Sequence, residues 1–337
     1  MNKILSVKPL GFPWQTQDPF LFCVHHRDEF PAGNEHMGVD ADHLAGRNVG
    51  NDFTIKDGWR MYHGKKVPGF PYHPHRGFET ITIAREGFID HTDSLGAAGR
   101  FGTGDTQWMT AGAGVQHSEM FPLVHRNKGN TTELFQIWLN LPRAKKMVNP
   151  HFKMLWREHI PVLKEKDDNG KVTEVQIVAG EVKGIKALDP TPDSWAADPE
   201  NAVWVLTIRM DAGAQWTLPA SVANANRTLF YYKGQSLAVE DQNLTPQYLV
   251  NLKADEEIDL QNGSEESFFL LLQGVPIDEP VVQYGPFVMN SEEEIRQAFD
   301  DYRRTEFGGW PWPKQEQVHD RDQGRFALHA DGRREEQ

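Results

Sequence analysis

The stretch that decides the fold of this chain is Tyr72-His73-Pro74-His75-Arg76-Gly77-Phe78-Glu79-Thr80-Ile81-Thr82-Ile83. Its second half is β-branched at every position of Thr80–Ile83, which is typical of a strand in a packed sheet. Gly87–His91 alternates, and Leu134–Leu139 is a nearly continuous apolar run. Glycine-containing turns separate these runs at the spacing expected of a barrel or sandwich. Residues 71–142 therefore predict a compact antiparallel β domain.

The second half of the chain repeats this pattern of strand-like runs separated by turns. Strand-like runs recur at Ala202–Ile208, Thr228–Tyr232 and Ser267–Leu272. With 337 residues the chain is long for one domain. We expect one barrel over 1–142, a connector with strands over 143–200, a second barrel over 201–312, and a loosely held polar tail over 313–337.

A single helix is predicted near 291–303. Ser291 can cap it, and Glu294 three residues later completes a capping box. Ile295, Ala298, Phe299 and Tyr302 then follow at helical spacing, which gives the helix one apolar face.

The overall composition narrows the class of protein. A net charge of −13 disfavours direct binding to nucleic acid or to anionic membranes. No stretch approaches the roughly 18 apolar residues of a membrane span. The single cysteine, Cys23, fits a small buried hydrophobe and a reducing compartment. These features predict a cytoplasmic protein.

Two short motifs carry candidate chemistry. His73 and His75 are two residues apart, so on a strand both imidazoles project from one face. His117 and Glu119 form a second such pair after glycine-rich turns. Two antiparallel strands could bring both pairs to one metal ion inside a barrel. Glu79 shares the parity of the first pair if the strand stays regular, so parity alone leaves Glu79 and Glu119 as rival carboxylates.

Three imidazoles and one carboxylate leave open positions on an octahedral ion. Such a set suits Fe(II), Mn(II), Ni(II), Cu(II) or Zn(II), and ligand chemistry does not choose among them. Most other histidines are expected to be surface residues or hydrogen-bonded core residues. These are His25, His26, His36, His43, His63, His91, His125, His151 and His159.

Long segments in order resemble the pirin family of the cupin superfamily. They are His73–Thr80, Gly104–Gly112 and His117–Glu119, with a weaker match at Tyr284–Asn290. The resemblance implies an all-β bicupin, with two antiparallel jelly-roll β-barrels packed face to face and a short C-terminal helix. It also implies a monomer, since both barrels lie in one chain.

The resemblance places the metal ligands at His73, His75, His117 and Glu119. The general cupin pattern would use Glu79 instead, but Gly87 lies one residue later than that pattern requires and His117 lies further from Gly112. Both departures agree with the pirin variant. The metal expected is a divalent transition ion, with Fe(II) favoured and Mn, Ni, Cu, Co or Zn as alternatives. No metal is expected in the second barrel, where Asn224-Ala225-Asn226-Arg227 stands near the equivalent position.

Three functions follow from this resemblance. Some pirins resemble quercetin 2,3-dioxygenases, which open a flavonol ring with dioxygen and release carbon monoxide. Glu119 would then be metal ligand and general base, and Phe78, Trp108 and Met109 would line the pocket or belong to the core. Other pirins resemble redox-responsive transcriptional coregulators with a protein partner, in which Arg76 would belong to a surface switch. A metal-bearing binding module without chemistry is the third. Extra segments at 22–66 and 313–337 leave the substrate open.

Overall fold

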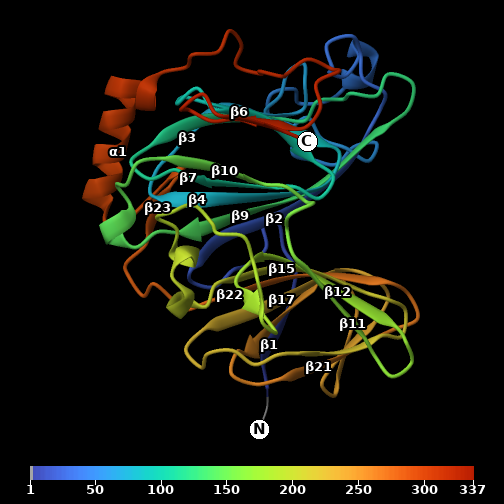
Figure 1. The fold of residues 1–337 in the computed structure, drawn as a ribbon. Coiled ribbons are helices and arrows are strands. Elements are labelled where there is room, and N and C mark those ends of the chain that lie inside the picture. Colours follow the sequence, from blue (N-terminus) through green and yellow to red (C-terminus); the bar gives the residue numbers. More distant parts are fainter. Residues whose placement is uncertain (1–2) are drawn as a thin grey trace. The chain divides into compact units, whose positions relative to one another are not determined.

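A computed structural model describes residues 3–337 and consists largely of antiparallel strands with one α-helix (Figure 1). The chain divides into two compact units. The first unit comprises residues 25–137, 141–157 and 279–337, and the second comprises 3–24, 138–140 and 158–278. The units therefore interleave along the chain, unlike the contiguous ranges expected from the sequence. Strands from the expected connector over 143–200 belong to both.

Two sheets lie mainly in the first unit, and only residues 20–24 and 138–140 of their strands belong to the second. The five-stranded sheet has the order β10-β7-β4-β9-β2, with bounds His151–Leu155, Thr106–Thr110, Phe78–Glu86, Asn130–Asn140 and Phe20–Phe30. The six-stranded sheet has the order β26-β25-β6-β5-β8-β3, with bounds Arg334–Glu336, Phe326–Leu328, Ala98–Gly102, Phe88–Asp93, Val115–Met120 and Gly69–His75. A short hairpin joins β23 (Val282–Tyr284) and β24 (Phe287–Met289).

The interior of the first unit has an apolar part and a polar part, and the same strands line both. Ala84, Ile89 and Leu134 lie in one buried cluster with Phe101 and Trp156. Residues of matching parity further along the same strands are polar, namely Thr82, His91 and Gln136. Because successive side chains of a strand point to opposite faces, these polar groups share the interior face with the apolar cluster.

The second unit is an apolar counterpart. Its seven-stranded sheet has the order β1-β20-β17-β22-β15-β12-β11, with bounds Ile4–Pro9, Tyr248–Lys253, Asn226–Lys233, Ser267–Gly274, Trp204–Met210, Val172–Ala179 and Val162–Lys166. Its four-stranded sheet is β16-β21-β18-β19, with bounds Gln215–Leu218, Ile258–Asn262, Leu237–Val239 and Gln242–Leu244. β13 (Glu181–Val182) and β14 (Ile185–Lys186) form a small hairpin. Cys23 is fully buried, as expected, and its thiol is free.

The predicted helix is α1 (Glu292–Thr305), and its capping is confirmed. The Ser291 hydroxyl accepts from the backbone N–H of Glu294. The Glu294 carboxylate accepts from the backbone N–H of Asn290, one residue before the cap position that a capping box would use. Ile295 and Ala298 are buried, with Phe299 packed alongside. The described residues also contain five short 3-10 helices, at Ala41–Leu44, Arg143–Lys145, Trp195–Ala197, Pro199–Asn201 and Glu306–Gly308. No helix within residues 3–337 has the length and apolar character needed to cross a membrane.

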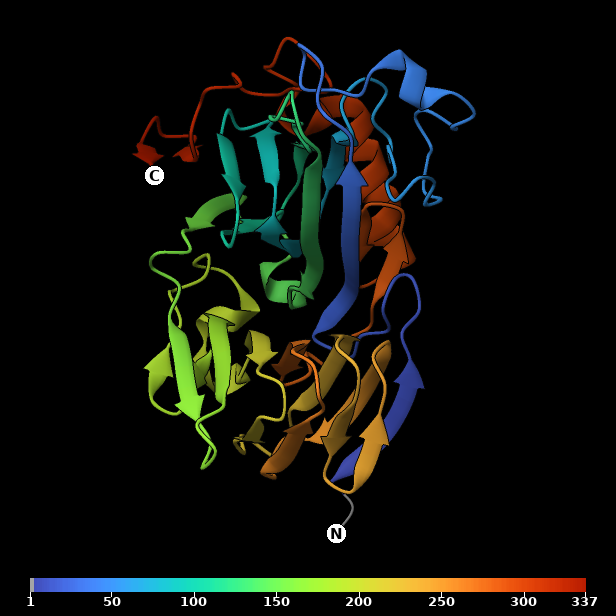
Figure 2. The ribbon, with the colours of Figure 1, turned by 90° about the vertical axis from the view of Figure 1, so that its right-hand side faces the viewer.

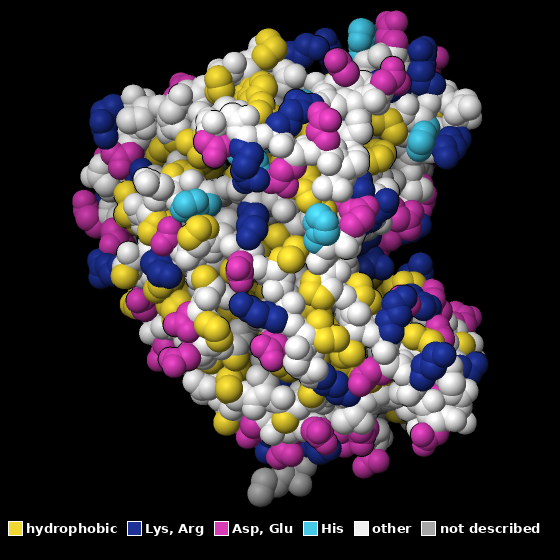
Figure 3. All heavy atoms as spheres, viewed as in Figure 1, with side chains coloured by type: hydrophobic (Ala, Val, Ile, Leu, Met, Phe, Trp, Pro, Cys, Tyr) yellow, Lys and Arg dark blue, Asp and Glu magenta, His cyan; other side chains and the backbone are white. Residues whose placement is uncertain are grey.

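The expectation of a loosely held tail is wrong. The C-terminal segment runs along one end of the first unit (Figure 2), and β25 pairs with β6. Phe326 and Ala327 are buried. The Arg100 guanidinium, itself buried, donates to the carbonyls of His319, Asp320 and Gln323. The polar composition of the tail misled the prediction because its anchoring uses backbone groups and ion pairs, which composition does not reveal. On the face drawn in Figure 3, charged side chains of both signs are interspersed.

Candidate metal centre

Strands β3 and β8 bring the two sequence motifs together. They are antiparallel neighbours, and His73 lies directly opposite His117. A register shift between Phe70 and His73 keeps both β3 histidines on the side of His117. The candidate ligand nitrogens of His73, His75 and His117 all lie within 4.8 Å of one another. Three of the four predicted residues thus form one compact cluster.

Burial keeps these imidazoles in the form that binds metal. His75 and His117 are buried, while His73 is partly exposed. Burial lowers the pKa of His73, and lowers the pKa values of His75 and His117 well below the ordinary range, because a buried imidazolium loses its hydration. All three rings are therefore neutral at neutral pH.

Two of the rings are oriented from behind by backbone carbonyls. The Nδ1 atom of His73 lies 2.9 Å from the Pro71 carbonyl oxygen, and that of His75 lies 3.4 Å from the Pro286 carbonyl oxygen. A carbonyl can only accept, so the His73 Nδ1 carries the proton and its Nε2 is free to coordinate. The longer His75 contact favours the same tautomer.

Glu119 lies beside this cluster. Its Oε2 atom is 3.8 Å from His117 Nε2. Its two oxygens accept hydrogen bonds from the Thr82 hydroxyl at 3.1 Å and from the Gln136 amide at 2.9 Å. Glu119 is 2% exposed, and these two donors satisfy its buried oxygens and hold the carboxyl group in place beside the His117 ring.

Glu79 lies elsewhere. β3 ends at His75, and Gly77 has a φ of +86°, so the strand does not continue regularly into β4 and the parity argument fails. Glu79 instead lies on the opposite face of β4 from Thr82. Its Oε1 atom accepts from Trp108 Nε1 at 3.2 Å and from the Thr110 hydroxyl at 2.7 Å.

The turn between β3 and β4 is fixed by buried charges. Lys146 donates to the carbonyls of Gly77 at 2.8 Å and Val288 at 3.1 Å. Burial lowers the pKa of this ammonium group to about 8, against the pull of two nearby glutamates. Arg76 donates to the Ala113 carbonyl and pairs with Asp301 of α1 at 2.9 Å. Arg76 is only 5% exposed, so it does not form the surface switch considered from the sequence.

His91 is a hydrogen-bonded core residue, as expected, since its Nε2 lies 3.3 Å from Asp93 Oδ2. Its ring lies 5.6 Å from that of His117, and its Nδ1 is buried without a hydrogen-bond partner. Two other interior groups were missed by the sequence reasoning. Gln107, opposite Thr82, has both amide atoms buried and unpartnered. Gln136 interrupts the apolar run Leu134–Leu139. A lone polar residue in such a run was the available signal, because a buried side-chain amide needs hydrogen-bond partners.

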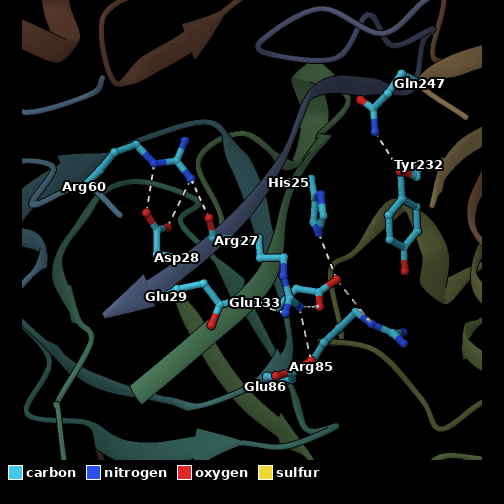
Figure 4. Close-up of polar contacts among 10 residues, drawn as sticks. All are labelled: His25, Arg27, Asp28, Glu29, Arg60, Arg85, Glu86, Glu133, Tyr232 and Gln247. Carbon is cyan, nitrogen blue, oxygen red and sulfur yellow. Dashed lines mark hydrogen bonds and ion pairs between the residues drawn. The ribbon is translucent and has the colours of Figure 1, made fainter. Parts of the chain in front are cut away.

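Other histidines behave as expected of hydrogen-bonded residues. His25 Nε2 lies 2.9 Å from Glu133 Oε1, and Glu133 also pairs with Arg27 (Figure 4). His26 Nδ1 lies 2.9 Å from the hydroxyl of Tyr62, which donates to Asp28. Arg60 completes this buried group through its ion pair with Asp28.

The donor set fits a transition metal. Both ring nitrogens of His117 are buried and make no hydrogen bond, which is costly unless something else satisfies one of them. Neutral imidazoles are good ligands for divalent transition ions, and a carboxylate in reach lowers the net charge of the site.

Comparisons with known proteins identify the family and the fold of this chain. The family model described as Pirin matches residues 40–139, and the Pirin C-terminal cupin domain matches residues 205–308. Pirin-1 of Arabidopsis thaliana is 37% identical over 261 residues, covering 71% of this chain and 78% of the relative. The Pseudomonas aeruginosa protein named "Putative quercetin 2,3-dioxygenase PA2418" is 37% identical over 242 residues, covering 71% and 79%. The crystal structure of quercetin 2,3-dioxygenase from Acinetobacter baumannii superposes with a TM-score of 0.71 at 27% identity, covering 92% of this chain and 99% of that one.

Proposed function

The chain belongs to the pirin family and has its bicupin fold, and we propose that it is a metal-dependent dioxygenase of the quercetin 2,3-dioxygenase type. The reaction would open the central ring of a flavonol with dioxygen and release carbon monoxide. The observation that carries the proposal is the cluster of three neutral imidazoles, with His117 unpartnered and a buried carboxylate beside it. The names of two similar proteins, one of them a solved structure, support the substrate class.

We assign the metal ligands to His73, His75, His117 and Glu119, and we favour Fe(II) over Mn, Ni, Cu, Co or Zn. When bound, the ion supplies a Lewis acid that lowers the pKa of a flavonol hydroxyl, and open positions for the substrate and dioxygen. Glu119 is preferred to Glu79 because Glu79 projects from the opposite face of β4 and accepts two hydrogen bonds there.

Glu119 also suits the role of general base. Its two oxygens already accept from Thr82 and Gln136, and a carboxylate oxygen has a second lone pair for another donor. A flavonol hydroxyl placed beside Oε2 would donate to it and then transfer its proton. Both existing donors orient the carboxylate without supplying a competing proton.

The remaining interior groups can orient the flavonol. Gln107 offers an unused amide donor and acceptor opposite Thr82, which suits the hydroxyl and carbonyl groups of such a substrate. Phe78 contacts the His75 ring edge-to-face at 5.1 Å and adds an aromatic wall. Trp108 donates a hydrogen bond to Glu79 on the other face of the sheet, so we assign Trp108 to the supporting core.

The test is metal analysis followed by turnover. The purified protein would be loaded with each candidate metal, and loss of flavonol long-wavelength absorbance and carbon monoxide release would be followed with and without dioxygen. We expect dioxygen-dependent loss with at least one metal. Absence of turnover with every metal, despite stoichiometric binding, would refute the enzyme and leave the redox-responsive coregulator or binding protein as the alternative.

A matched pair of variants tests the carboxylate. Glu119→Gln should lose both activity and metal affinity, by about 100-fold or more, since even residues behind a ligand contribute 10- to 100-fold. Glu79→Gln should retain the metal, because its carboxylate faces Trp108 and Thr110. The opposite pattern would overturn the ligand assignment.

A further inference from the structure

The second unit contains a buried arginine, Arg227, at the end of the Asn224–Arg227 segment that stands near the position equivalent to the metal ligands. Arg227 is the second residue of β17 and is 1% exposed. It shares strand parity with Leu229 and Tyr231, which belong to the apolar core of this unit. Its side chain therefore points into the interior of the unit and not to solvent.

No carboxylate of the described residues forms an ion pair with this guanidinium. Its Nε donates to the Gln273 side-chain oxygen at 2.6 Å, and Nη1 makes only a 3.5 Å contact with the Glu256 carbonyl. Nη2 is buried without a hydrogen-bond partner. The group lies 5.1 Å from the ring of Trp204. Burial lowers the pKa of Arg227 to about 10, against the opposing charge of Asp255. A buried cation without an ion pair is unusual because its lost hydration goes uncompensated.

A directed hydrogen-bond chain leads from Arg227 to a hydroxyl. Arginine can only donate, so the Gln273 oxygen must face it and the Gln273 amide nitrogen must point away. That nitrogen donates to Ser221 Oγ at 2.9 Å and to the Ala202 carbonyl at 3.1 Å. Since Ser221 Oγ accepts this bond, its own hydrogen remains free to donate onward. Each link polarises the next, so the Ser221 hydroxyl is a strengthened donor.

Ser221 and Trp204 both line a cavity of about 290 Å³ within the second unit. Its walls are largely apolar, with Ala187, Leu188, Val203 and the Trp204 ring among them. One cation, Lys186, also lines it, but Lys186 pairs with Asp189 at 3.3 Å. Glu181, Asp198 and the Asp189 that pairs with Lys186 line it as well, so a ligand with several negative charges would be repelled.

We propose that this cavity binds a small monocarboxylate with an apolar or aromatic body. The carboxylate accepts from the Ser221 hydroxyl, with Arg227 behind it as the compensating charge. The apolar body packs against Trp204 and the aliphatic wall. This site is separate from the three-histidine cluster and does not depend on the reaction proposed there.

The probe is benzoate, with neutral benzamide as its near-isosteric control. Each would be titrated calorimetrically into the metal-loaded full-length protein at pH 7.5. We expect saturable benzoate binding in the millimolar range or tighter, with benzamide at least about tenfold weaker, because hydrogen bonds to a charged acceptor are stronger than those to a neutral one.

Two substitutions and one control locate the site. Ser221→Ala should weaken benzoate binding about tenfold, the loss expected for one hydrogen bond to a charged group. Arg227→Met should weaken it further. Ser264→Ala, at an exposed serine of the same unit, should leave it unchanged.

Three results would overturn the site: no benzoate binding, equal binding of benzamide, or undiminished binding by Ser221→Ala. The last result would show that benzoate binds elsewhere in the protein. Ser221→Ala leaves Arg227 and Gln273 paired, so the test stands even if Arg227→Met fails to fold.

Discussion

The ion pair between Arg325 and Asp105 anchors the C-terminal segment to the first unit, and Arg325→Met is the sharpest test of that anchoring. Arg325 Nη1 lies 2.6 Å from Asp105 Oδ1, with the Asp105 side chain fully buried and that of Arg325 11% exposed. Asp105 also accepts from the amides of Gly102 and Arg157. Burial raises the pKa of Asp105, while Arg325 and these amides oppose that rise.

The magnitude follows from leaving Asp105 buried without its cation. Removing one partner of a buried pair typically costs about 3–5 kcal/mol, because the remaining charge keeps its desolvation penalty. In a unit of this size each kcal/mol lowers the melting temperature by roughly 2–4 °C, so a fall of about 6–20 °C is expected. Methionine keeps most of the aliphatic volume, so the loss reports the charge.

The measurement is calorimetric unfolding, with hydrogen exchange to locate the change. Exchange should accelerate in β25 and β6, whose pairing the ion pair supports. Arg334→Met is the matched control, since Arg334 lies in the same segment and pairs with Glu336 at the surface. That change should cost less than about 1 kcal/mol. Equal, small losses in both variants would show that the segment does not depend on the buried pair.

Three further outcomes are expected. Burial alone would raise the pKa of Glu133, but the His25 hydrogen bond and two nearby arginines lower it to about 2, below the ordinary 4.5. Its charge therefore stabilises the fold above pH 4.5, and this effect is lost as the pH falls toward 2. Glu133→Gln should lower the free energy of unfolding in urea by roughly 3 kcal/mol at pH 7 and by progressively less below pH 4.5. A difference that does not change with pH would contradict this. Ser291→Ala should destabilise α1 by about 1 kcal/mol, and unchanged exchange of the Glu294 amide would argue against the cap. Gly77→Ala should lower the free energy of unfolding by at least about 1–3 kcal/mol and reduce metal binding. The reason is that φ is +86° and a Cβ would lie 2.0 Å from the Val288 carbonyl oxygen. Full metal occupancy would show that the turn adapts.

Local patterns in the sequence were sufficient for the strands, the helix and the histidine pairs. β-branched runs and two-residue spacing are properties of a single strand, so they can be read without knowing its neighbours. The Ser291 cap is equally local, because its donor and acceptor lie three residues apart. The pirin resemblance added the bicupin fold, which the comparisons confirm.

By itself the sequence therefore determined the all-β character of the chain and the motifs from which the candidate centre is built. The tertiary structure alone decided which face of β4 carries Glu79, because Gly77 breaks the strand before it. It also decided that the polar tail is anchored, and that Arg227 is buried without an ion pair. These outcomes depend on groups that meet across long sequence separations. Burial and ion pairing set the free-energy cost of each charged group, and neither can be predicted from the local sequence.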